Sequence, residues 1–326
     1  MELDPKRLMI LRAIAEGGGV AAAARALGHT PSAVSQQLNR LERETGVPLV
    51  DRTGGRAELT ASGRLLAQAG ERIQQALTDA TRELNALGEQ AAGPVAIGVP
   101  ATAISYFATT ALHLLATAHP ALQPRLVETG PAEGLRALRL GELDALVIAD
   151  DQDAPTPLPP GVRATALLED EYRLVLPDGW AEPADWAELS GRPWIGAPAD
   201  SPRGVVFQRL AAEHGIVPSV QHVARYPFAV YSMLAARLGP AILTATAASR
   251  LTHGVVAGLA VPGGYVVRLL RRTGPSGAVP AVEATAEALQ QAVLLAAERM
   301  AGLGLLEREP RVRPRLVDPS ERTRTE

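Results

Sequence analysis

The 326-residue sequence contains no cysteine, and Lys6 is its only lysine. Without cysteine, a disulfide scaffold, a thiolate metal site and a cysteine nucleophile are all excluded. No run of about 18 apolar residues free of charge occurs, so we expect no transmembrane helix. The first residues, MELDPKRLMI, lack a basic region followed by an apolar one. We therefore expect no signal peptide and a cytoplasmic protein.

The sequence patterns of common enzyme sites are also missing. There is no GxSxG elbow, no P-loop and no GxGxxG pattern. The six histidines are scattered, and none forms a metal-spaced pair. Asp150, Asp151 and Asp153 precede a proline-rich loop, which favours a solvated turn. We therefore expect no enzymatic activity, no cofactor and no metal.

The length and hydrophobic content predict two or three folded domains. Hydrophobic residues make up 47% of the chain, which is ample for buried cores. The chain has 32 basic and 35 acidic residues, and its net charge is -3. This balance is not that of a global nucleic-acid binder, so any such role must lie in a local patch.

Three short helices are predicted in the first 45 residues. Asp4 is a good N-cap and Pro5 suits the first helical position, while Gly17 to Gly19 ends that helix. A second helix is predicted over 20–27 and a third over 31–45, with Thr30 as its N-cap. Because the turn between these two is short and contains glycine, the pattern indicates a helix-turn-helix.

The third helix separates apolar from polar side chains. Val34, Leu38 and Leu41 recur at helical spacing and should face a core. The other faces carry small polar, amide and guanidinium groups, which reach base edges and phosphates from the major groove. The simpler alternative is a small helical subdomain whose polar face is merely solvated.

A short β-wing is predicted next. Two β-like runs, around 49–51 and 57–60, flank a turn at Gly54-Gly55. Arg52 and Arg56 stand on either side of this turn and could reach phosphates or a narrow minor groove.

The segment from Leu8 to Gly63 resembles the winged helix-turn-helix of LysR-type transcriptional regulators. The matching residues are Ala15-Glu16, Ala23-Ala24, Leu27, Pro31-Ser32, Val34-Ser35, Gln37, Leu41-Glu42, Gly46, Leu49, Arg52, Leu59-Thr60 and Gly63. Val50 and Ile14 depart from the aromatic residues usual in that family, and both replacements are apolar. The resemblance implies DNA contacts from Thr30, Pro31, Ser32, Ser35, Gln36 and Arg40, and from Arg52 and Arg56 in the wing.

A long helix without proline is predicted from about residue 60 to 90. Apolar residues recur there with a heptad period, at Leu66, Ile73, Leu77, Leu84 and Leu87. One interpretation is an amphipathic helix that packs on its own domain. The other, which the resemblance favours, is a linker helix that forms a dimer.

From about residue 94, strands alternate with helices, which predicts an α/β fold with parallel strands. Strands are expected near 95–99, 123–129, 144–150, 172–176, 194–197, 241–243, 259–261 and 265–270. Helices are expected near 102–118, 131–142, 205–214 and 281–300.

This region resembles the LysR effector domain, which has the two-lobed periplasmic-binding-protein fold. The motifs are HPALQPRLVETG, LRALRLGELDALVI and LEDEYRLVLP. The predicted division is a DNA-binding domain over 1–60, a linker helix over 61–90 and an effector domain over 91–303. Lobe one would take 94–163 and 268–303, and lobe two 164–267. A disordered tail would follow over 304–326, where basic, acidic and proline residues are mixed.

A ligand is expected in the cleft between the lobes, outside the carboxyl ends of the strands. The candidate residues are Ala101, Thr102, Ala103, Thr129, Gly130, Asp200, Ser201, Arg203, Tyr226 and Phe228. Each of these could instead be an ordinary turn or core residue. Because the loop over 101–104 is small and mostly apolar, we expect a weakly polar or amphipathic metabolite.

These observations predict a DNA-binding regulator that senses a small-molecule effector. The expected partners are a dyad-symmetric double-stranded operator, a second or further copies of the chain as a homodimer or homotetramer and, for an activator, RNA polymerase. One alternative is a cytoplasmic small-molecule-binding protein whose N-terminal helices only dimerise; another is an enzyme that uses the cleft. The first 65 residues hold nine basic and seven acidic residues. This small excess predicts that tight DNA binding needs two copies.

Overall fold

The computed structural model describes residues 3–51, 58–86, 91–273 and 279–302. It divides into two compact units, with the boundary in the main chain between Leu87 and Gly88. Arg52, Arg56, Leu87 and the tail over 304–326 lie outside the described residues. Among the described helices, none combines the length and apolar character needed to cross a bilayer.

The N-terminal unit contains the predicted helix-turn-helix. Its helices are α1 (Pro5–Gly17), α2 (Val20–Leu27) and α3 (Pro31–Thr45), followed by the antiparallel pair β1 (Val50–Asp51) and β2 (Glu58–Leu59). Both predicted N-caps are confirmed. The Asp4 carboxylate accepts a hydrogen bond from Lys6 N at 2.9 Å, and Thr30 Oγ1 accepts one from Ala33 N at 3.2 Å.

Helix α4 (Ala61–Ala86) packs along α1 within the same unit. Gly70 allows this approach, because a Cβ atom there would lie 2.4 Å from the Leu8 carbonyl oxygen in α1. Gly63 allows a similar approach to the segment before β1, where a Cβ atom would lie 2.0 Å from the Leu49 carbonyl oxygen. The heptad seam is therefore divided. Its first half, with Leu66 and Ile73, packs against the core of the helix-turn-helix. Its second half is exposed, at 56% for Leu77 and 69% for Leu84.

The C-terminal unit is built on one eight-stranded mixed sheet with the order β4-β3-β5-β10-β6-β9-β7-β8. The parallel strands β3, β4 and β5 form one end and the parallel strands β9, β7 and β8 form the other. The bounds are β3 (Gly93–Val99), β4 (Leu122–Glu128), β5 (Ala145–Asp151), β7 (Trp194–Gly196), β8 (Gln221–Val223) and β9 (Ala241–Thr244).

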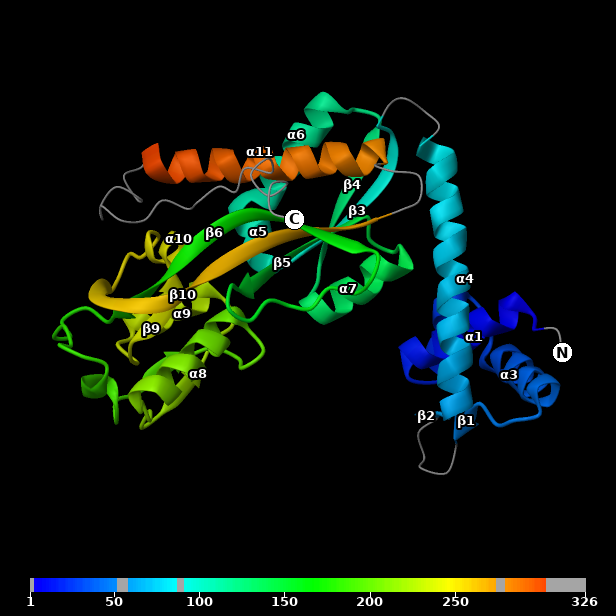
Figure 1. The fold of residues 1–326 in the computed structure, drawn as a ribbon, viewed down its shortest axis with the longest axis horizontal. Coiled ribbons are helices and arrows are strands. Elements are labelled where there is room, and N and C mark those ends of the chain that lie inside the picture. The colour runs from blue at the N-terminus through cyan, green and yellow to red at the C-terminus, as the bar shows by residue number, and fades with distance from the viewer. Residues whose placement is uncertain (1–2, 52–57, 87–90, 274–278, 303–326) are drawn as a thin grey trace, which may run out of the picture. The chain divides into compact units, whose positions relative to one another are not determined.

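Helices cover both faces of each end of the sheet, because alternate strand residues point to opposite faces. In β3, Ile97 joins the core under α6 (Thr109–Ala118) and α11 (Pro280–Gly302), while Ala96 joins the core with α7 (Pro131–Leu140). Figure 1 shows α6 and α11 together on one side of this end of the sheet. At the other end, the sheet packs against α8 (Pro202–His214) on one face. On the opposite face it packs against α9 (Pro227–Ala235) and α10 (Ala245–Ala248).

Two long strands cross between the lobes. The sequence predicts short strands over 172–176, 259–261 and 265–270, whereas the structure has β6 (Val162–Leu176) and β10 (Val255–Arg272). Bulges in β10 between Val256 and Gly264 break the alternation of its side chains, which is why the sequence pattern reads as separate pieces. The two strands pair antiparallel, and Tyr265 lies opposite Asp170 near the middle of the crossing.

The helix predicted over 102–118 changes its winding. It consists of α5 (Ala101–Ala103), a π-helical segment (Ile104–Ala108) and α6. The π-helical segment presents Tyr106 and Phe107 to the cavity described below. Single π-helical turns within α-helices are frequent at functional sites.

Candidate functional site

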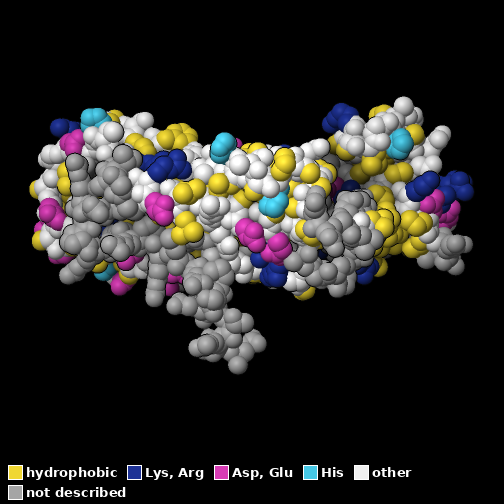
Figure 2. Space-filling model, turned by 90° about the horizontal axis from the view of Figure 1, so that it is seen from above, with side chains coloured by type: hydrophobic (Ala, Val, Ile, Leu, Met, Phe, Trp, Pro, Cys, Tyr) yellow, Lys and Arg dark blue, Asp and Glu magenta, His cyan; other side chains and the backbone are white. Residues whose placement is uncertain are grey.

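The proposed DNA-binding residues form one exposed face at the start of α3. Thr30, Pro31, Ser32, Gln36 and Arg40 are exposed and Ser35 is half-buried, while the opposite face of α3 is buried. The Thr30 hydroxyl also has a structural role, since it caps the helix. On the face of the protein seen in Figure 2, basic and acidic side chains are interspersed among hydrophobic and other ones.

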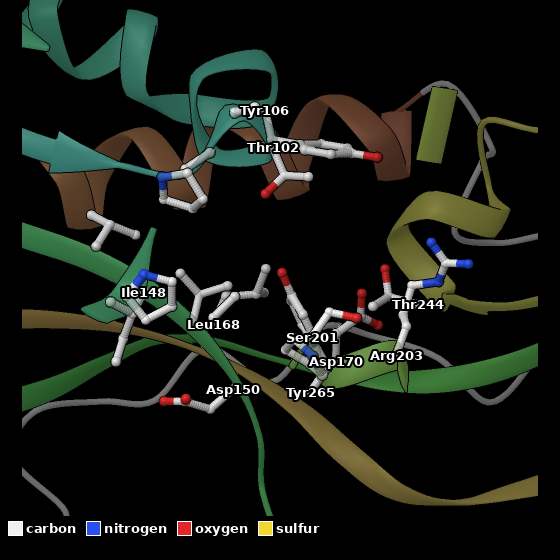
Figure 3. A pocket seen from close by; sticks show the side chains of 18 of the residues that line it. Thr102, Tyr106, Ile148, Asp150, Leu168, Asp170, Ser201, Arg203, Thr244 and Tyr265 are labelled. Carbon is white, nitrogen blue, oxygen red and sulfur yellow. The ribbon is translucent and has the colours of Figure 1, made fainter. Parts of the chain in front are cut away.

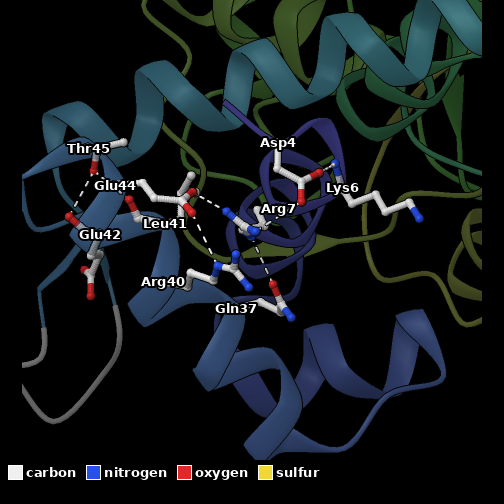
Figure 4. A network of polar contacts seen from close by, with 9 residues as sticks. All are labelled: Asp4, Lys6, Arg7, Gln37, Arg40, Leu41, Glu42, Glu44 and Thr45. Atoms are coloured by element: carbon white, nitrogen blue, oxygen red, sulfur yellow. Dashed lines mark hydrogen bonds and ion pairs between the residues drawn. The ribbon is translucent and has the colours of Figure 1, made fainter. Parts of the chain in front are cut away.

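A buried arginine that the sequence analysis missed fixes α3 against α1. Arg7 is 9% exposed and pairs with Glu44 on α3, and its Nε donates to Gln37 Oε1 at 3.1 Å (Figure 4). Glu44 also accepts a hydrogen bond from Arg40 Nε at 3.3 Å. The network therefore positions Arg40, and it explains why Gln37 is not on the exposed face. Long-range ion pairs of this kind leave no local periodicity in a sequence.

Two further side chains hold the described base of the wing. The Glu42 carboxylate accepts hydrogen bonds from the backbone N–H groups of Leu49 at 2.8 Å and Val50 at 3.2 Å. Thr60 Oγ1 donates to the Pro48 carbonyl at 2.8 Å and accepts from Gly63 N at 3.0 Å. Glu42, Thr60 and Gly63 thus join α3, the wing and α4.

A cavity of about 890 Å³ lies in the C-terminal unit between the two lobes. Its walls come from the carboxyl ends of β3, β4 and β5 in one lobe and from the starts of α8, α9 and α10 in the other. Its volume is in the range of sites that bind metabolite-sized ligands.

Nine of the ten predicted effector residues line this cavity. They are Ala101, Thr102, Ala103, Thr129, Gly130, Asp200, Ser201, Arg203 and Tyr226. Figure 3 shows Thr102 and Tyr106 on one side of the open space, with Ser201, Arg203 and Asp170 on the other. Phe228 does not belong to the lining: it is 67% exposed and stacks on Tyr226, with ring centroids 5.6 Å apart. Tyr226, at the N-cap of α9, lines the cavity, whereas the side chain of Phe228, the second residue of that helix, is directed to solvent.

The prediction that Asp150 and Asp151 form a solvated turn is wrong. Asp150 is 4% exposed and Asp151 is 2% exposed, because both lie at the end of the buried strand β5. Arg268 Nε donates to Asp150 Oδ2 at 2.7 Å, and Arg209 Nη1 lies 3.0 Å from Asp151 Oδ1. Asp153, at the surface, contacts the same Arg209. The partner arginines lie 58 and 118 residues away, so the sequence neighbourhood does not reveal them.

The cavity also contains a buried acid that the sequence analysis missed. Asp170, in the middle of β6, is 5% exposed, and its carboxylate accepts hydrogen bonds from Glu171 N at 2.8 Å and Thr246 N at 3.0 Å. Burial raises the pKa of Asp170, against the effect of these hydrogen bonds. The only sequence signal is the run LEDEYRLVLP, whose resemblance to the effector domain indicates the fold and not the role of this acid.

Arg203 is a buried, positively charged residue in the cavity wall. Its Nε donates to the Ile242 carbonyl at 2.7 Å and its Nη1 to the Ala224 carbonyl at 3.3 Å. Burial lowers the pKa of Arg203 to about 10, so the group remains a cation at neutral pH. Within the described ranges, no His, Asp and Glu side chains are grouped as a metal site would require.

Comparison with known proteins gives a family for both units. The model of the LysR substrate binding domain matches residues 88–293, and that of the bacterial regulatory helix-turn-helix proteins of the lysR family matches residues 5–64. The regulator CbbR of Xanthobacter flavus is 33% identical over 172 residues, which cover 52% of this chain and 49% of that protein. A probable hydrogen peroxide-inducible genes activator of Mycobacterium xenopi is also 33% identical over 172 residues, covering 53% of this chain and 88% of that protein. The match thus spans about half the length of the Xanthobacter relative.

Solved structures share the fold over nearly the whole chain. A full-length variant of OxyR from Pseudomonas aeruginosa aligns with a TM-score of 0.60 at 21% identity, over 90% of this chain and 96% of that one. Full-length LysG from Corynebacterium glutamicum, solved with its effector Arg bound, aligns with a TM-score of 0.52 at 21% identity, over 90% of this chain and 99% of that one. Because family models match both units, the chain belongs to the LysR family of bacterial transcriptional regulators.

Proposed function

We propose that the protein binds a DNA operator through α3 and regulates transcription in response to a small molecule held in the interlobe cavity. The observation that carries the proposal is the exposed polar face of α3, with Ser32, Ser35, Gln36 and Arg40, in a unit of the family's helix-turn-helix type. Amide, hydroxyl and guanidinium groups on such a helix can contact base edges and phosphates. Arg52 and Arg56 in the wing would add contacts to the phosphate backbone of the DNA.

The second half of α4 supports a homodimer. Leu77 and Leu84 are exposed apolar side chains seven residues apart on one helix face, as in a coiled-coil seam. Leu87 would extend this face, whereas Leu66 and Ile73 are already partly buried within their own unit. A dimer presents two α3 helices to a dyad-symmetric operator, and a tetramer would present four. RNA polymerase would be a further partner of an activator.

The division of labour within the chain is part of the same proposal. Residues 1–60 would bind DNA, 61–90 would link and dimerise, and 91–303 would bind the effector. An effector that binds two arrangements of the lobes with different affinity would shift their populations. Such a protein would act in the cytoplasm, where the chromosome is accessible to it.

The proposal is tested by exchanging side chains on the exposed face of α3. Genomic fragments bound by the purified chain are first selected, and a bound fragment is then titrated at fixed salt by fluorescence anisotropy. The double variant Ser35→Ala/Arg40→Ala should bind more weakly, by roughly 1–3 kcal/mol for each specific contact that is lost. Arg125→Ala removes one positive charge from the exposed surface of β4 and is the control.

Equal affinity of the native chain and the double variant would remove α3 from the interface. If no fragment is bound even at low salt, the alternative of a ligand-binding protein whose N-terminal helices only dimerise becomes the better account.

A further inference from the structure

The cavity contains more carboxylates than guanidinium groups. Six of its lining residues are acidic and two are arginines. Both arginines already have partners: Arg225 Nη2 lies 2.9 Å from Asp200 Oδ1, and Arg203 donates to two backbone carbonyls. An anionic ligand would therefore compete with existing contacts for either guanidinium.

Asp170 differs from the other two buried acids of the cavity. Asp150 and Asp151 each pair with an arginine, whereas Asp170 forms no ion pair with any described residue. Its hydrogen bonds come only from uncharged donors, which include the backbone N–H groups of Glu171 and Thr246. A carboxylate that is 5% exposed and lacks a cation is costly to keep ionised. A positively charged ligand group would offset that cost.

A hydroxyl lies next to this acid. Thr246 is 6% exposed and lines the cavity, and hydrogen bonding from its side chain acts to lower the pKa of Asp170, against the larger effect of burial. The hydroxyl and the carboxylate therefore form one polar spot in the cavity wall. Because the backbone N–H of Thr246 also donates to Asp170, the Thr246 hydroxyl and the Asp170 carboxylate lie at the same end of the cavity.

Aromatic rings are concentrated around the same space. The whole chain has only three tryptophans, five tyrosines and three phenylalanines, yet Tyr106, Phe107, Tyr226 and Tyr265 all line the cavity. Tyr265 lies directly opposite Asp170 on the neighbouring strand. The face of an aromatic ring attracts cations. The Arg250 guanidinium, 4.0 Å from the centroid of the Tyr106 ring, already covers that ring, which favours Tyr265 as the contact of a ligand cation.

We propose that the ligand of this cavity carries a protonated amine or guanidine, which forms an ion pair with Asp170 and lies against Tyr265. This inference rests on the proposed effector function, because it names the chemical class of that effector. It also replaces the weakly polar metabolite expected from the sequence. The buried carboxylate comes from a crossing strand, and the loop over 101–104 gives no sign of it.

The test uses sets of small molecules that share a carbon skeleton and differ in charge. Butylamine, benzylamine and agmatine are compared with butyrate and benzoate, and with butanol and benzyl alcohol. Each is added at millimolar concentration to the full-length chain, and binding is measured by thermal stabilisation and by calorimetry. We expect amines or guanidines to stabilise the protein, and the matched carboxylates and alcohols to have no effect.

Variants connect that selectivity to the proposed residue. Asp170→Asn should reduce the affinity for the bound amine by about 10- to 100-fold, since a charge-assisted hydrogen bond is lost. Thr246→Val keeps the backbone N–H and the shape, and should reduce the affinity by a smaller factor. Glu171→Gln is the matched control: it removes the neighbouring carboxylate, whose side chain is 56% exposed and contacts Arg173. Circular dichroism of each variant establishes that it is folded.

Three results would overturn the proposal: stabilisation by carboxylates instead of amines, no stabilisation of the native chain by any amine or guanidine of the set, or amine binding that Asp170→Asn leaves unchanged. Operator binding is measured on the same samples. If a carboxylate stabilises the chain and changes operator affinity, the ligand class is wrong while the proposed regulator stands. If amines bind through Asp170 but no bound molecule changes operator affinity, the ligand class stands and effector control of DNA binding fails.

Discussion

Without a ligand, the ionised carboxylate of Asp170 lowers the stability of the folded protein, and this effect depends on pH. Burial raises its pKa in the folded chain above the ordinary value of 3.8, and the charge of Asp170 in turn acts to raise the pKa of Tyr106 and of Tyr265. A raised carboxyl pKa means that the protonated form is favoured by folding. The contribution of protonated Asp170 to the stability of the fold is therefore complete below its pKa in the unfolded chain. This contribution is lost as the pH rises through its pKa in the folded chain.

We predict that Asp170→Asn becomes relatively more stable as the pH increases. The free energy of unfolding of the native chain, minus that of the variant, should fall between pH 4 and pH 7 in the absence of ligand. Urea unfolding at both pH values measures this difference, with Glu171→Gln as the exposed control. A difference that stays constant or grows with pH would show that Asp170 is stabilised as a carboxylate by its surroundings.

At the residue scale, the sequence predicted which residues line the cavity better than it predicted which side chains form ion pairs with residues distant in the sequence. The strand-end rule placed Ser201 and Thr129 at the cavity, because the carboxyl ends of parallel strands meet at one edge. It could not predict that Asp151 pairs with Arg209, since that contact joins residues 58 positions apart on different lobes. Arg7 and Asp170 were missed for the same reason: their roles depend on burial produced by distant segments.

At the scale of the helices and strands, the packing of α4 on α1 depends on a glycine. A Cβ at Gly70 would lie 2.4 Å from the Leu8 carbonyl oxygen, which belongs to the backbone of α1 and cannot rotate away. In an exposed helix, replacement of glycine by alanine is favourable by up to about 1 kcal/mol. Here overpacking should dominate, at a typical cost of about 1–3 kcal/mol.

Gly70→Ala should therefore destabilise the N-terminal unit and weaken operator binding, because α1 also holds α3 through Arg7. The melting midpoint of the chain, followed by circular dichroism, measures the first effect. Gln68→Ala, at an exposed position on the same helix, is the control and should leave the midpoint nearly unchanged. If Gly70→Ala raises the midpoint, helix propensity outweighs packing and α4 is not held against α1.

The heptad pattern in α4 shows what periodicity can and cannot predict. It identified a long amphipathic helix, and the structure has one over Ala61–Ala86. It did not distinguish a partner within the chain from a partner in a second copy, because both need apolar residues at the same spacing. The first interpretation is confirmed for Ile73, which contacts the core of its own unit. Leu77 and Leu84 are exposed, and their contact with a second copy stays a prediction.

At the scale of the whole molecule, the charges predict that tight DNA binding depends on assembly. The chain has a net charge of -3, yet its first 65 residues hold nine basic and seven acidic groups. One such unit can neutralise few phosphates. Because the logarithm of the binding constant falls with that of salt concentration with a slope of about -0.9 for each neutralised phosphate, the slope reports how many units are bound.

We predict that Leu77→Glu/Leu84→Glu yields a monomer whose salt slope is about half that of the native protein, since it carries one DNA-binding unit in place of two. Light scattering gives the mass in solution, and fluorescence anisotropy at several salt concentrations gives the slope. Leu65→Glu/Gln68→Glu adds the same charge at exposed positions off the seam and should remain dimeric, with the native slope. A charged seam variant that keeps both the native mass and the native slope would place the dimer contact elsewhere. A monomer with the native slope would show instead that a single unit makes all the phosphate contacts.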